Sequence, residues 1–556
     1  MKTRRKERAL AQVLERRANG GAEREALIYR QGDNVRDIVT GADLMERAQR
    51  AAAGIRAAGA MKGDRVMLML TSQSDFVDAF LGAVWADTVP VPLFPPLFSR
   101  RPDDFIANFA NIAAGSGARL LIASDDISRA ALEFSSRLAG AIHVLARSAW
   151  GESGERLMEA PQRCGNDLAL LQYTSGSTGM PKGVALSHTN LVTNMEAIGR
   201  AVNLSMDDTG VSWLPLYHDM GLIGVLSTLY RGGRVVVLSP LEFAKDPASW
   251  LRAISDHRGT LSPAPNFAYE RCLRLDADDI ADIDLSSWRV AFNGAEPVRA
   301  DTVRRFTARF GAAGFRSTAF YPVYGLAEHT LAVSFPRLGE GPRFDTVDRG
   351  ELTGSGVAIP SSGNDAVSFV SVGRPLDGVS VEIRDERGAT LNEGRVGEIT
   401  VQSDSVMTGY FGNPAASADV LDSGWLKTGD LGYFRNGLLY VTGRIKDVII
   451  RAGRNYYPDD IERAINGLDG VRAGRAAAFS VPADAGREDV VVVVETTAEC
   501  ELHSARLIKL ISSAIAARVG FVPERIDLHA RDTLPLTSSG KVRRSVVRER
   551  FLAGTL

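Results

Sequence analysis

The sequence has few cysteines, almost no net charge and no long apolar run, and each of these absences excludes a class of protein. Its 556 residues include three cysteines, Cys164, Cys272 and Cys500, without a CxxC pair. That argues against a disulfide framework or a cysteine zinc site, so we expect a reducing, cytoplasmic location. The 65 basic and 67 acidic side chains nearly cancel, which disfavours a general nucleic-acid binder. No apolar run approaches the roughly 20 residues needed to cross a bilayer, so an integral membrane protein is not expected.

The composition is that of an ordinary globular protein. Hydrophobic residues make up 45% and charged residues 24% of the chain, which excludes intrinsic disorder. At about 150 residues per domain, the length predicts three or four folding units, some of them fused. The basic N-terminus, residues 1–20, lacks the apolar block and cleavage site of a signal peptide, and its spacing predicts an exposed helix.

Helical patterns alternate with short β-branched runs such as DRVMLML (64–70) and GRVVVLS (233–239), which predicts layered α/β units with largely parallel sheets. From about 372 to 440 the pattern changes to strands punctuated by Gly, Asn and Asp, which indicates an antiparallel or barrel-like element. After GRIKD a smaller, mildly basic α/β unit begins. The stretch 336–362 is rich in Gly, Pro and Ser and has no periodicity, so we interpret it as a surface loop or an insertion.

We therefore predict an α/β fold with two parts. Residues 1–443 form a large body of two layered α/β subdomains plus a β-barrel-like subdomain, and residues 444–556 form a small C-terminal α/β domain. A hinge joins them.

The most informative segment is LQYTSGSTGMPKGVALSHTN, residues 171–190. Hydroxyls interleaved with glycines allow backbone N–H groups and side-chain oxygens to converge on polyphosphate. The spacing is not that of a Walker A loop, and a bare Ser/Gly run would be a solvated loop. The ordered string after an apolar strand favours phosphate binding instead. The predicted ATP-binding residues here are Thr174, Ser175, Gly176, Ser177, Thr178, Gly179 and Lys182.

With this segment the sequence resembles the adenylate-forming superfamily of acyl-CoA ligases, luciferases and nonribosomal-peptide adenylation domains. Four further motifs follow in the family's order: YGLAE (324–328), TGD (428–430), GRIKD (443–447) and SSGKVRR (538–544). One such string would mean little, but five in register across most of the chain are highly specific. The resemblance implies a ligase that uses ATP and Mg²⁺.

The resemblance also implies roles for individual residues around the nucleotide. Glu328, with the Thr174 hydroxyl, would hold Mg²⁺ against the triphosphate, since hard oxygen ligands suit that ion. Asp430 would accept hydrogen bonds from the ribose hydroxyls. The remaining nucleotide contacts implied are Asn293, Gly294, Ala295, Tyr324, Gly325 and Arg444. Composition alone would make Glu328 a surface residue, Asp430 a turn residue and Tyr324 core filler, and the motifs outweigh that reading.

Lys541 would meet the negative charge that develops as a carboxylate attacks the α-phosphate. By composition it would belong to a solvated basic tail. Because Lys541 lies beyond GRIKD, the resemblance implies that docking of the small domain assembles the site. A pivot at Lys446 would then move Lys541 away and admit a thiol.

Within the superfamily the sequence looks most like the fatty acyl-AMP ligases, which load acyl carrier proteins. The strings that carry this resemblance are WLPLYHDMGLIG (213–224), APNFAYERC (264–272), FNGAEPVR (292–299) and RAGRNYYPDDIE (451–462). Ala327 stands where acyl-CoA ligases carry Thr, and 336–370 lies where this branch has an insertion that restrains the small domain. His329 departs from the pattern, which normally has a small residue there.

The implied substrates are a fatty acid and, because the chain ends soon after SGKVRR, an acyl carrier protein supplied in trans. The acyl pocket implied comprises His218, Met220, Gly221 and Phe267. A fatty acyl-CoA ligase, an amino-acid-adenylating domain and a catalytically silent nucleotide-binding homologue remain alternatives. Acyl chain length, the identity of the carrier, the oligomeric state and the role of His329 stay open.

Overall fold

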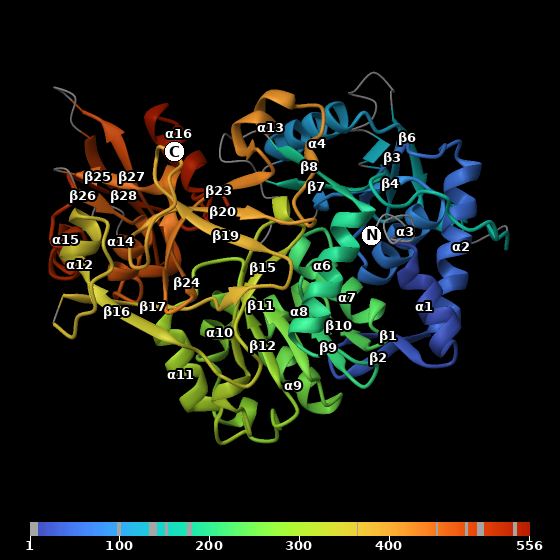
Figure 1. Ribbon diagram of the computed structural model, residues 1–556, viewed down its shortest axis with the longest axis horizontal. Coiled ribbons are helices and arrows are strands. Elements are labelled where there is room, and N and C mark those ends of the chain that lie inside the picture. Colours follow the sequence, from blue (N-terminus) through green and yellow to red (C-terminus); the bar gives the residue numbers. More distant parts are fainter. Residues whose placement is uncertain are drawn as a thin grey trace.

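The protein was analysed as a computed structural model, shown in Figure 1. It describes residues 9–96, 102–129, 131–132, 142–150, 154–174, 181–363, 365–451, 454–483, 488–497, 505–536 and 542–556. The chain runs from the N-terminal helices on one side of Figure 1, through the central sheet, to the C-terminal strands and helices on the opposite side. The predicted α/β class is confirmed.

The central sheet has seven strands in the described part of the chain, in the order β13-β12-β11-β9-β10-β1-β2. Neighbouring strands are parallel except for β1 and β2. In this order they span Phe320–Pro322, Val290–Asn293, Leu261–Ala264, Thr209–Ser212, Arg234–Val237, Glu25–Gln31 and Asn34–Thr40. Val235 and Val237 pack into one core cluster and Val236 into another, because successive strand side chains point to opposite faces.

A second parallel sheet contains β4 (Val89–Pro92), β3 (Arg65–Met69), β5 (Leu120–Ala123) and β6 (His143–Ala146), in that order. Beside β4 lies an antiparallel sheet of β7 (Leu168–Thr174), β8 (Lys182–Ser187) and β21 (Gly409–Tyr410). The two parallel sheets confirm the prediction from the alternating helical and β-branched runs.

The region predicted to be antiparallel or barrel-like contributes strands to two antiparallel sheets. One contains β19 (Ser380–Arg384), β20 (Gly397–Gln402), β23 (Trp425–Arg435), β22 (Leu421–Asp422) and β24 (Leu438–Arg444). The other contains β14 (Tyr324–Gly325), β15 (Ala332–Phe335) and β18 (Arg374–Pro375). After β24, the 3₁₀ turn η7 (Ile445–Asp447) leads to the C-terminal sheets, β25 (Ile449–Arg451) with β26 (Arg454–Tyr456), and β27 (Val471–Pro482) with β28 (Glu488–Thr496) and β29 (Arg525–His529).

Helices cover both faces of the central sheet (Figure 1). On one side lie α1 (Gln12–Gly21), α2 (Gly41–Ala57), α3 (Gln73–Trp85), α6 (His188–Ala201) and α7 (Asp219–Tyr230). On the other lie α8 (Pro240–Lys245), α9 (Ala248–Asp256), α10 (Asn266–Cys272) and α11 (Ala300–Phe310). The remaining α-helices described are α4 (Pro102–Ser116), α12 (Arg349–Gly354), α13 (Pro414–Val420), α14 (Pro458–Ile465), α15 (Ala505–Val519) and α16 (Arg544–Leu552). No described helix combines the length and apolarity needed to cross a membrane.

One local expectation was wrong, and of the two interpretations of 336–362 the surface loop was wrong, whereas the insertion stays a prediction. The N-terminal helix was predicted to be exposed, but Val13, Leu14 and Arg17 of α1 are buried where the helix packs on α2 and α7. The aperiodic stretch 336–362 contains strand β16 (Phe344–Asp348) and helix α12, and β16 pairs with β17 (Ala366–Val370). Its short elements are stabilised by contacts with distant residues, which a local pattern does not reveal.

Candidate active site

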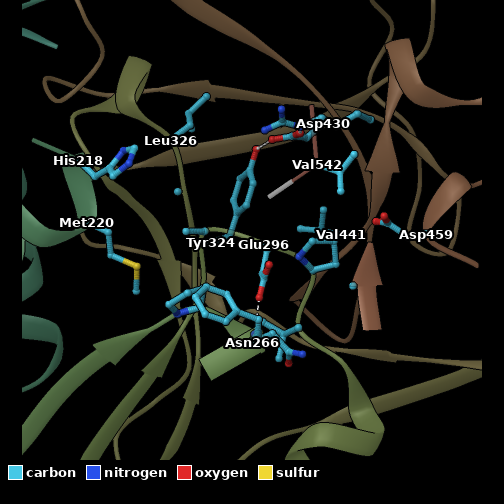
Figure 2. A pocket seen from close by; sticks show the side chains of 18 of the residues that line it. His218, Met220, Asn266, Glu296, Tyr324, Leu326, Asp430, Val441, Asp459 and Val542 are labelled. Atoms are coloured by element: carbon cyan, nitrogen blue, oxygen red, sulfur yellow. Dashed lines mark hydrogen bonds and ion pairs between the residues drawn. The ribbon is translucent and has the colours of Figure 1, made fainter. Parts of the chain in front are cut away.

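A large cleft opens where the central sheet, the antiparallel sheets and the C-terminal elements meet. Its volume is about 3180 Å³, and it is lined by residues that follow β9, β11, β12 and β13 together with a subset of the residues from Arg444 to Glu549. Ligands of parallel sheets bind at this carboxyl end of the strands. Figure 2 shows His218 and Met220 on one side of the cleft, Tyr324 and Asp430 in the middle, and Asp459 and Val542 on the other side.

Asp430 is held by two side chains that the sequence also implicates. The Tyr324 hydroxyl donates to Asp430 Oδ2 at 2.8 Å, and Arg444 Nε donates to Oδ1 at 2.9 Å (Figure 2 shows the first of these). Burial and the nearby carboxylate raise the pKa of Tyr324, so its hydroxyl stays a donor. The Asp430 carboxylate raises the pKa of Arg444. Each Asp430 carboxylate oxygen can accept a further hydrogen bond, and Asp430, Tyr324 and Arg444 all line the cleft.

Glu328 lies in the 3₁₀ turn η6 (Ala327–His329), and its carboxylate faces a residue that the motifs did not identify. The Tyr410 hydroxyl donates to Glu328 Oε1 at 2.9 Å. Lys182 Nζ lies 4.8 Å from the centre of the Tyr410 ring, within cation–π range. Burial and the Glu328 charge raise the pKa of Tyr410. Tyr410 therefore links Glu328 to the strand that follows the predicted phosphate loop.

The two ends of the phosphate loop are described. Thr174 closes β7 and Lys182 opens β8, and the two residues are partners in the antiparallel register. Both line the cleft. The predicted ligands Ser175, Gly176, Ser177, Thr178 and Gly179 lie outside the described residues. The two strand ends that flank the predicted loop therefore lie at the cleft that contains Glu328.

The donor set around Glu328 fits the predicted Mg²⁺. Thr174 and Glu328 both line the cleft and offer a hydroxyl and a carboxylate, which are oxygen ligands. Among the described residues, no group of three or more His, Cys, Asp or Glu side chains forms a metal cage. Mg²⁺ commonly takes one or two carboxylates and completes its shell with water and substrate phosphates. One carboxylate in the cleft that Thr174 also lines suits that mode of binding.

His329 points away from the cleft into the protein interior. It is fully buried, and its Nε2 lies 2.6 Å from Ser403 Oγ. Burial lowers the pKa of His329 to about 4, so the ring is neutral at physiological pH. Met407 N donates to the Glu328 carbonyl at 2.8 Å, which adds a second tie between this turn and the 403–407 segment. His329, the residue that departs from the family's pattern, therefore lies in the interior and does not line the cleft.

Of the three residues predicted to face the nucleotide after β12, one lines the cleft. Ala295 does so with a left-handed backbone at φ 64°, an uncommon conformation for a non-glycine residue. Asn293 is fully buried and donates to Asn266 Oδ1 at 3.2 Å, and Gly294 is buried against Val323. Gly325 lines the cleft, and a Cβ there would lie 1.8 Å from the Leu331 carbonyl oxygen, so the turn before Glu328 requires glycine.

The residues predicted for the acyl pocket all line the same cleft. They are His218, Met220, Gly221 and Phe267. His218 is the N-cap of α7, and its ring centre lies 5.0 Å from that of Tyr217. The ring centres of Phe267 and Trp213 lie 6.1 Å apart in an edge-to-face arrangement. Gly221 has a packing reason to be glycine, because a Cβ there would lie 2.4 Å from the Pro215 carbonyl oxygen.

The C-terminal residues that flank the predicted catalytic lysine in the sequence line the cleft. Lys541 itself lies outside the described residues. Leu536 and Val542 form an antiparallel bridge, and both line the cleft. Arg544, at the start of α16, donates to Asp447, Asp459 and Glu462 at 2.6 to 3.0 Å. This network ties the residues after Lys541 to η7, the turn that contains the predicted hinge residue Lys446.

The model of a known protein family, described as AMP-binding enzyme, matches residues 14–411 of this sequence. The chain belongs to the AMP-binding enzyme family. Across the curated proteins, it is 35% identical to a medium-chain-fatty-acid–[acyl-carrier-protein] ligase, JamA, of Moorena producens over 89% of this chain and 87% of that protein. It is 36% identical to a putative acyl-CoA synthetase of Caulobacter vibrioides, over 92% and 90% of the two chains.

Solved structures of the AMP-binding enzyme family share the fold. A structure from a study of fatty acyl-adenylate ligases of E. coli and L. pneumophila superposes with a TM-score of 0.92 at 35% identity, covering 99% of both chains. A fatty acyl-adenylate ligase from L. pneumophila in complex with acyl adenylate and pyrophosphate has a TM-score of 0.75 at 32% identity, covering 98% of this chain and 96% of that one. These likenesses support the two-part α/β architecture predicted from the motifs.

Proposed function

We propose that this AMP-binding enzyme is a fatty acyl-AMP ligase that activates a fatty acid with ATP and transfers the acyl group to an acyl carrier protein. The observation that carries the proposal is the convergence of two sets of side chains on one cleft. Asp430 with Tyr324 and Arg444 offers a ribose-binding side, and Thr174, Lys182 and Glu328 offer a phosphate side. The names of the JamA and L. pneumophila relatives support the same reaction.

In the first half-reaction, a fatty-acid carboxylate oxygen attacks the α-phosphorus of ATP. A new O–P bond forms while the bond to the leaving pyrophosphate breaks, giving acyl-AMP. The protein supplies positioning and positive charge, and no enzyme nucleophile is required. Lys182 and the proposed catalytic Lys541 would stabilise the charge that develops on the reacting oxygens, and bound Mg²⁺ supplies further neutralisation of the phosphate oxygens.

In the second half-reaction, the phosphopantetheine thiol of a separate carrier protein attacks the acyl carbonyl carbon. The thiol loses its proton, a thioester forms, and AMP leaves. We propose that residues 1–443 and 444–556 act as two domains and that rotation near Lys446 exchanges Lys541 for the thiol between the two steps. We place this reaction in the cytosol, consistent with free Cys164 and Cys272 thiols.

Contacts of the 336–370 segment support a carrier protein over coenzyme A as acceptor. Arg349 Nη1 lies 3.1 Å from Asp460 of α14 in an ion pair whose side chains are 16% and 12% exposed. Tyr457, which precedes α14, is buried in a cluster with Val347 and Leu352. The segment therefore braces the C-terminal part in the arrangement described, so rotation near Lys446 requires these contacts to break. We propose that docking of a carrier protein breaks them, whereas coenzyme A, which has no protein surface, does not.

The putative acyl-CoA synthetase of Caulobacter vibrioides favours a second candidate, an acyl-CoA ligase. Both share the first half-reaction, so the acceptor decides between them. The protein is incubated with a fatty acid, ATP and Mg²⁺, and with either coenzyme A or a holo-acyl carrier protein. We expect acyl-AMP with both mixtures and rapid thioester formation with the carrier. Fast acyl-CoA formation refutes carrier specificity, and an unchanged rate of adenylation in Lys541→Ala refutes the catalytic role of that lysine.

A further inference from the structure

Thr330, two residues after Glu328, has a backbone conformation that a β-branched residue rarely adopts. Its φ is 67° and its ψ is −60°, and Leu331 N donates to the His329 carbonyl at 2.7 Å across it. These values define the strained form of the γ-turn. In the part of the chain that the structure describes, Thr330 is the one β-branched residue with a positive φ. Such strain persists only where the surrounding structure holds it, and it gathers at functional sites.

The segment 403–407 holds one side of this turn. Thr330 is fully buried, and its Oγ1 donates to the Ser405 carbonyl at 2.9 Å. Met407 N donates to the Glu328 carbonyl at 2.8 Å. The segment therefore contacts the backbone of Glu328 and the side chain of the strained residue.

Asn190 of α6 fixes the position of this segment. Its Nδ2 donates to the carbonyls of Asp404 and Val406 at 2.8 and 2.9 Å, on either side of Ser405. Its Oδ1 accepts from Ser187 N and Ser187 Oγ, both at 2.8 Å, in the capping box that begins α6. The amide therefore has two separate tasks, because its oxygen caps the helix and its nitrogen holds the backbone that carries the Ser405 carbonyl.

Asn194, one helical turn after Asn190, holds the other side of the Glu328 turn. Its Oδ1 accepts from Ala332 N at 3.0 Å, and its Nδ2 donates to the Ala332 carbonyl at 2.9 Å. Ala332 opens β15, which lies beside α6 (Figure 1). Asparagine is less favourable than alanine inside a helix, and a buried amide costs free energy unless it is hydrogen-bonded. Both asparagines are buried, so these bonds to other segments are the physical reason for amides at the two positions.

We propose that Asn190 and Asn194 are positioning residues for Glu328. They hold the segment 403–407 and the start of β15, which keep Thr330 in its left-handed turn and thereby fix the Glu328 carboxylate in the cleft. This inference rests on the proposed function, in which Glu328 binds Mg²⁺ together with ATP. Because α6 directly follows β8, the helix also links the hairpin of the predicted phosphate loop to the Glu328 turn.

The test uses calorimetry of Mg²⁺ binding with ATP but without fatty acid, and a titration of Mg²⁺ in ATP–pyrophosphate exchange. Asn190→Asp keeps the oxygen that caps α6 and replaces the donor to Asp404 and Val406 by an acceptor. We expect the half-saturating Mg²⁺ concentration to rise about fivefold or more in both assays, with kcat at saturating Mg²⁺ within about twofold of the wild type. The added negative charge would by itself tighten Mg²⁺ binding, which is the opposite effect. Asn194→Asp should raise the concentration in the same way.

Thr330→Gly separates this positioning from general packing. Glycine adopts a positive φ without strain, so the turn then needs less support. In a Thr330→Gly background, Asn190→Asp should change the half-saturating Mg²⁺ concentration by less than about twofold. Asp43→Asn is the matched control, because Asp43 has the same place in the capping box of α2, where it accepts from Thr40 N and Thr40 Oγ1, and lies outside the cleft. We expect this control to leave the response to Mg²⁺ unchanged.

The outcomes separate this inference from the proposed function. If the wild type shows no exchange that depends on fatty acid, the proposed function fails, while weaker Mg²⁺ binding by Asn190→Asp in calorimetry still supports the positioning of Glu328. If Asn190→Asp binds Mg²⁺ as the wild type does, the inference fails. An equal rise with and without Thr330→Gly, or a rise in Asp43→Asn, also overturns it. Should Asn190→Asp not fold, Thr330→Val decides: it loses the bond to the Ser405 carbonyl and keeps a β-branched residue in the strained turn, so an unchanged Mg²⁺ response contradicts the inference.

Discussion

Removal of the Tyr410 hydroxyl tests how Glu328 is held. In Tyr410→Phe the ring under Lys182 Nζ stays, so the 4.8 Å cation–π contact is kept and the 2.9 Å hydrogen bond to Glu328 Oε1 is lost. Hydrogen bonds to charged groups contribute about 1.5–3 kcal/mol, and partial access of water to this carboxylate reduces the effect to about 1–2 kcal/mol. That corresponds to a roughly 5- to 30-fold weaker response to Mg²⁺.

The assay is a titration of Mg²⁺ in ATP–pyrophosphate exchange, together with calorimetry of Mg²⁺ and ATP binding, which reports binding without turnover. Tyr433→Phe is the matched control, because the Tyr433 hydroxyl donates to Asp345 Oδ2 at the same 2.9 Å but neither residue lines the cleft. We expect the half-saturating Mg²⁺ concentration to rise in Tyr410→Phe and to stay unchanged in Tyr433→Phe. Equal shifts in both variants, or none in Tyr410→Phe, would refute a positioning role for this hydroxyl.

Three further predictions concern the nucleotide, the Glu328 turn and the C-terminal segment. Asp430→Asn should raise the KM for ATP by about tenfold or more, since charge-assisted hydrogen bonds are lost, without changing the Mg²⁺ response; an unaltered ATP dependence contradicts this. Because the pKa of His329 is lowered to about 4, the unfolded state takes up a proton that the folded state does not. Stability is therefore lost as pH falls from 6.5 towards 4, and between pH 7.5 and pH 5 the wild type should lose about 2 kcal/mol more than His329→Gln in urea unfolding, whereas parallel losses would contradict the assignment. Arg544→Gln leaves three carboxylates without their shared partner and should destabilise the protein by about 2 kcal/mol or more and slow adenylation, and normal melting would exclude the network as a support.

The motifs predicted residues that share one cleft, because they carry their chemistry in short, ordered strings. Three distant segments of the sequence supply Thr174 with Lys182, Tyr324 with Glu328, and Asp430, and the structure brings all five residues to one cleft. The parallel sheets were equally predictable, since alternating helical and β-branched runs leave few other arrangements. The domain boundary near 443 and the roles of the individual site residues stay predictions.

The sequence did not reveal features that depend on contacts between distant segments. Tyr410 belongs to a two-residue strand, 82 positions after Glu328. Its position next to Glu328 depends on the pairing of that strand with β8. The sequence signal available for Tyr410 was the Gly-Tyr pair that follows a strand-rich region. The burial of α1 likewise depends on α2 and α7, and the His329 ring is explained by Ser403.

A crystal structure with a non-hydrolysable acyl-adenylate bound tests the central claim most directly. We expect the ribose hydroxyls within hydrogen-bonding distance of Asp430 and the adenine beside Tyr324. A nucleotide bound outside the cleft that Tyr324, Asp430 and Glu328 line would contradict the account.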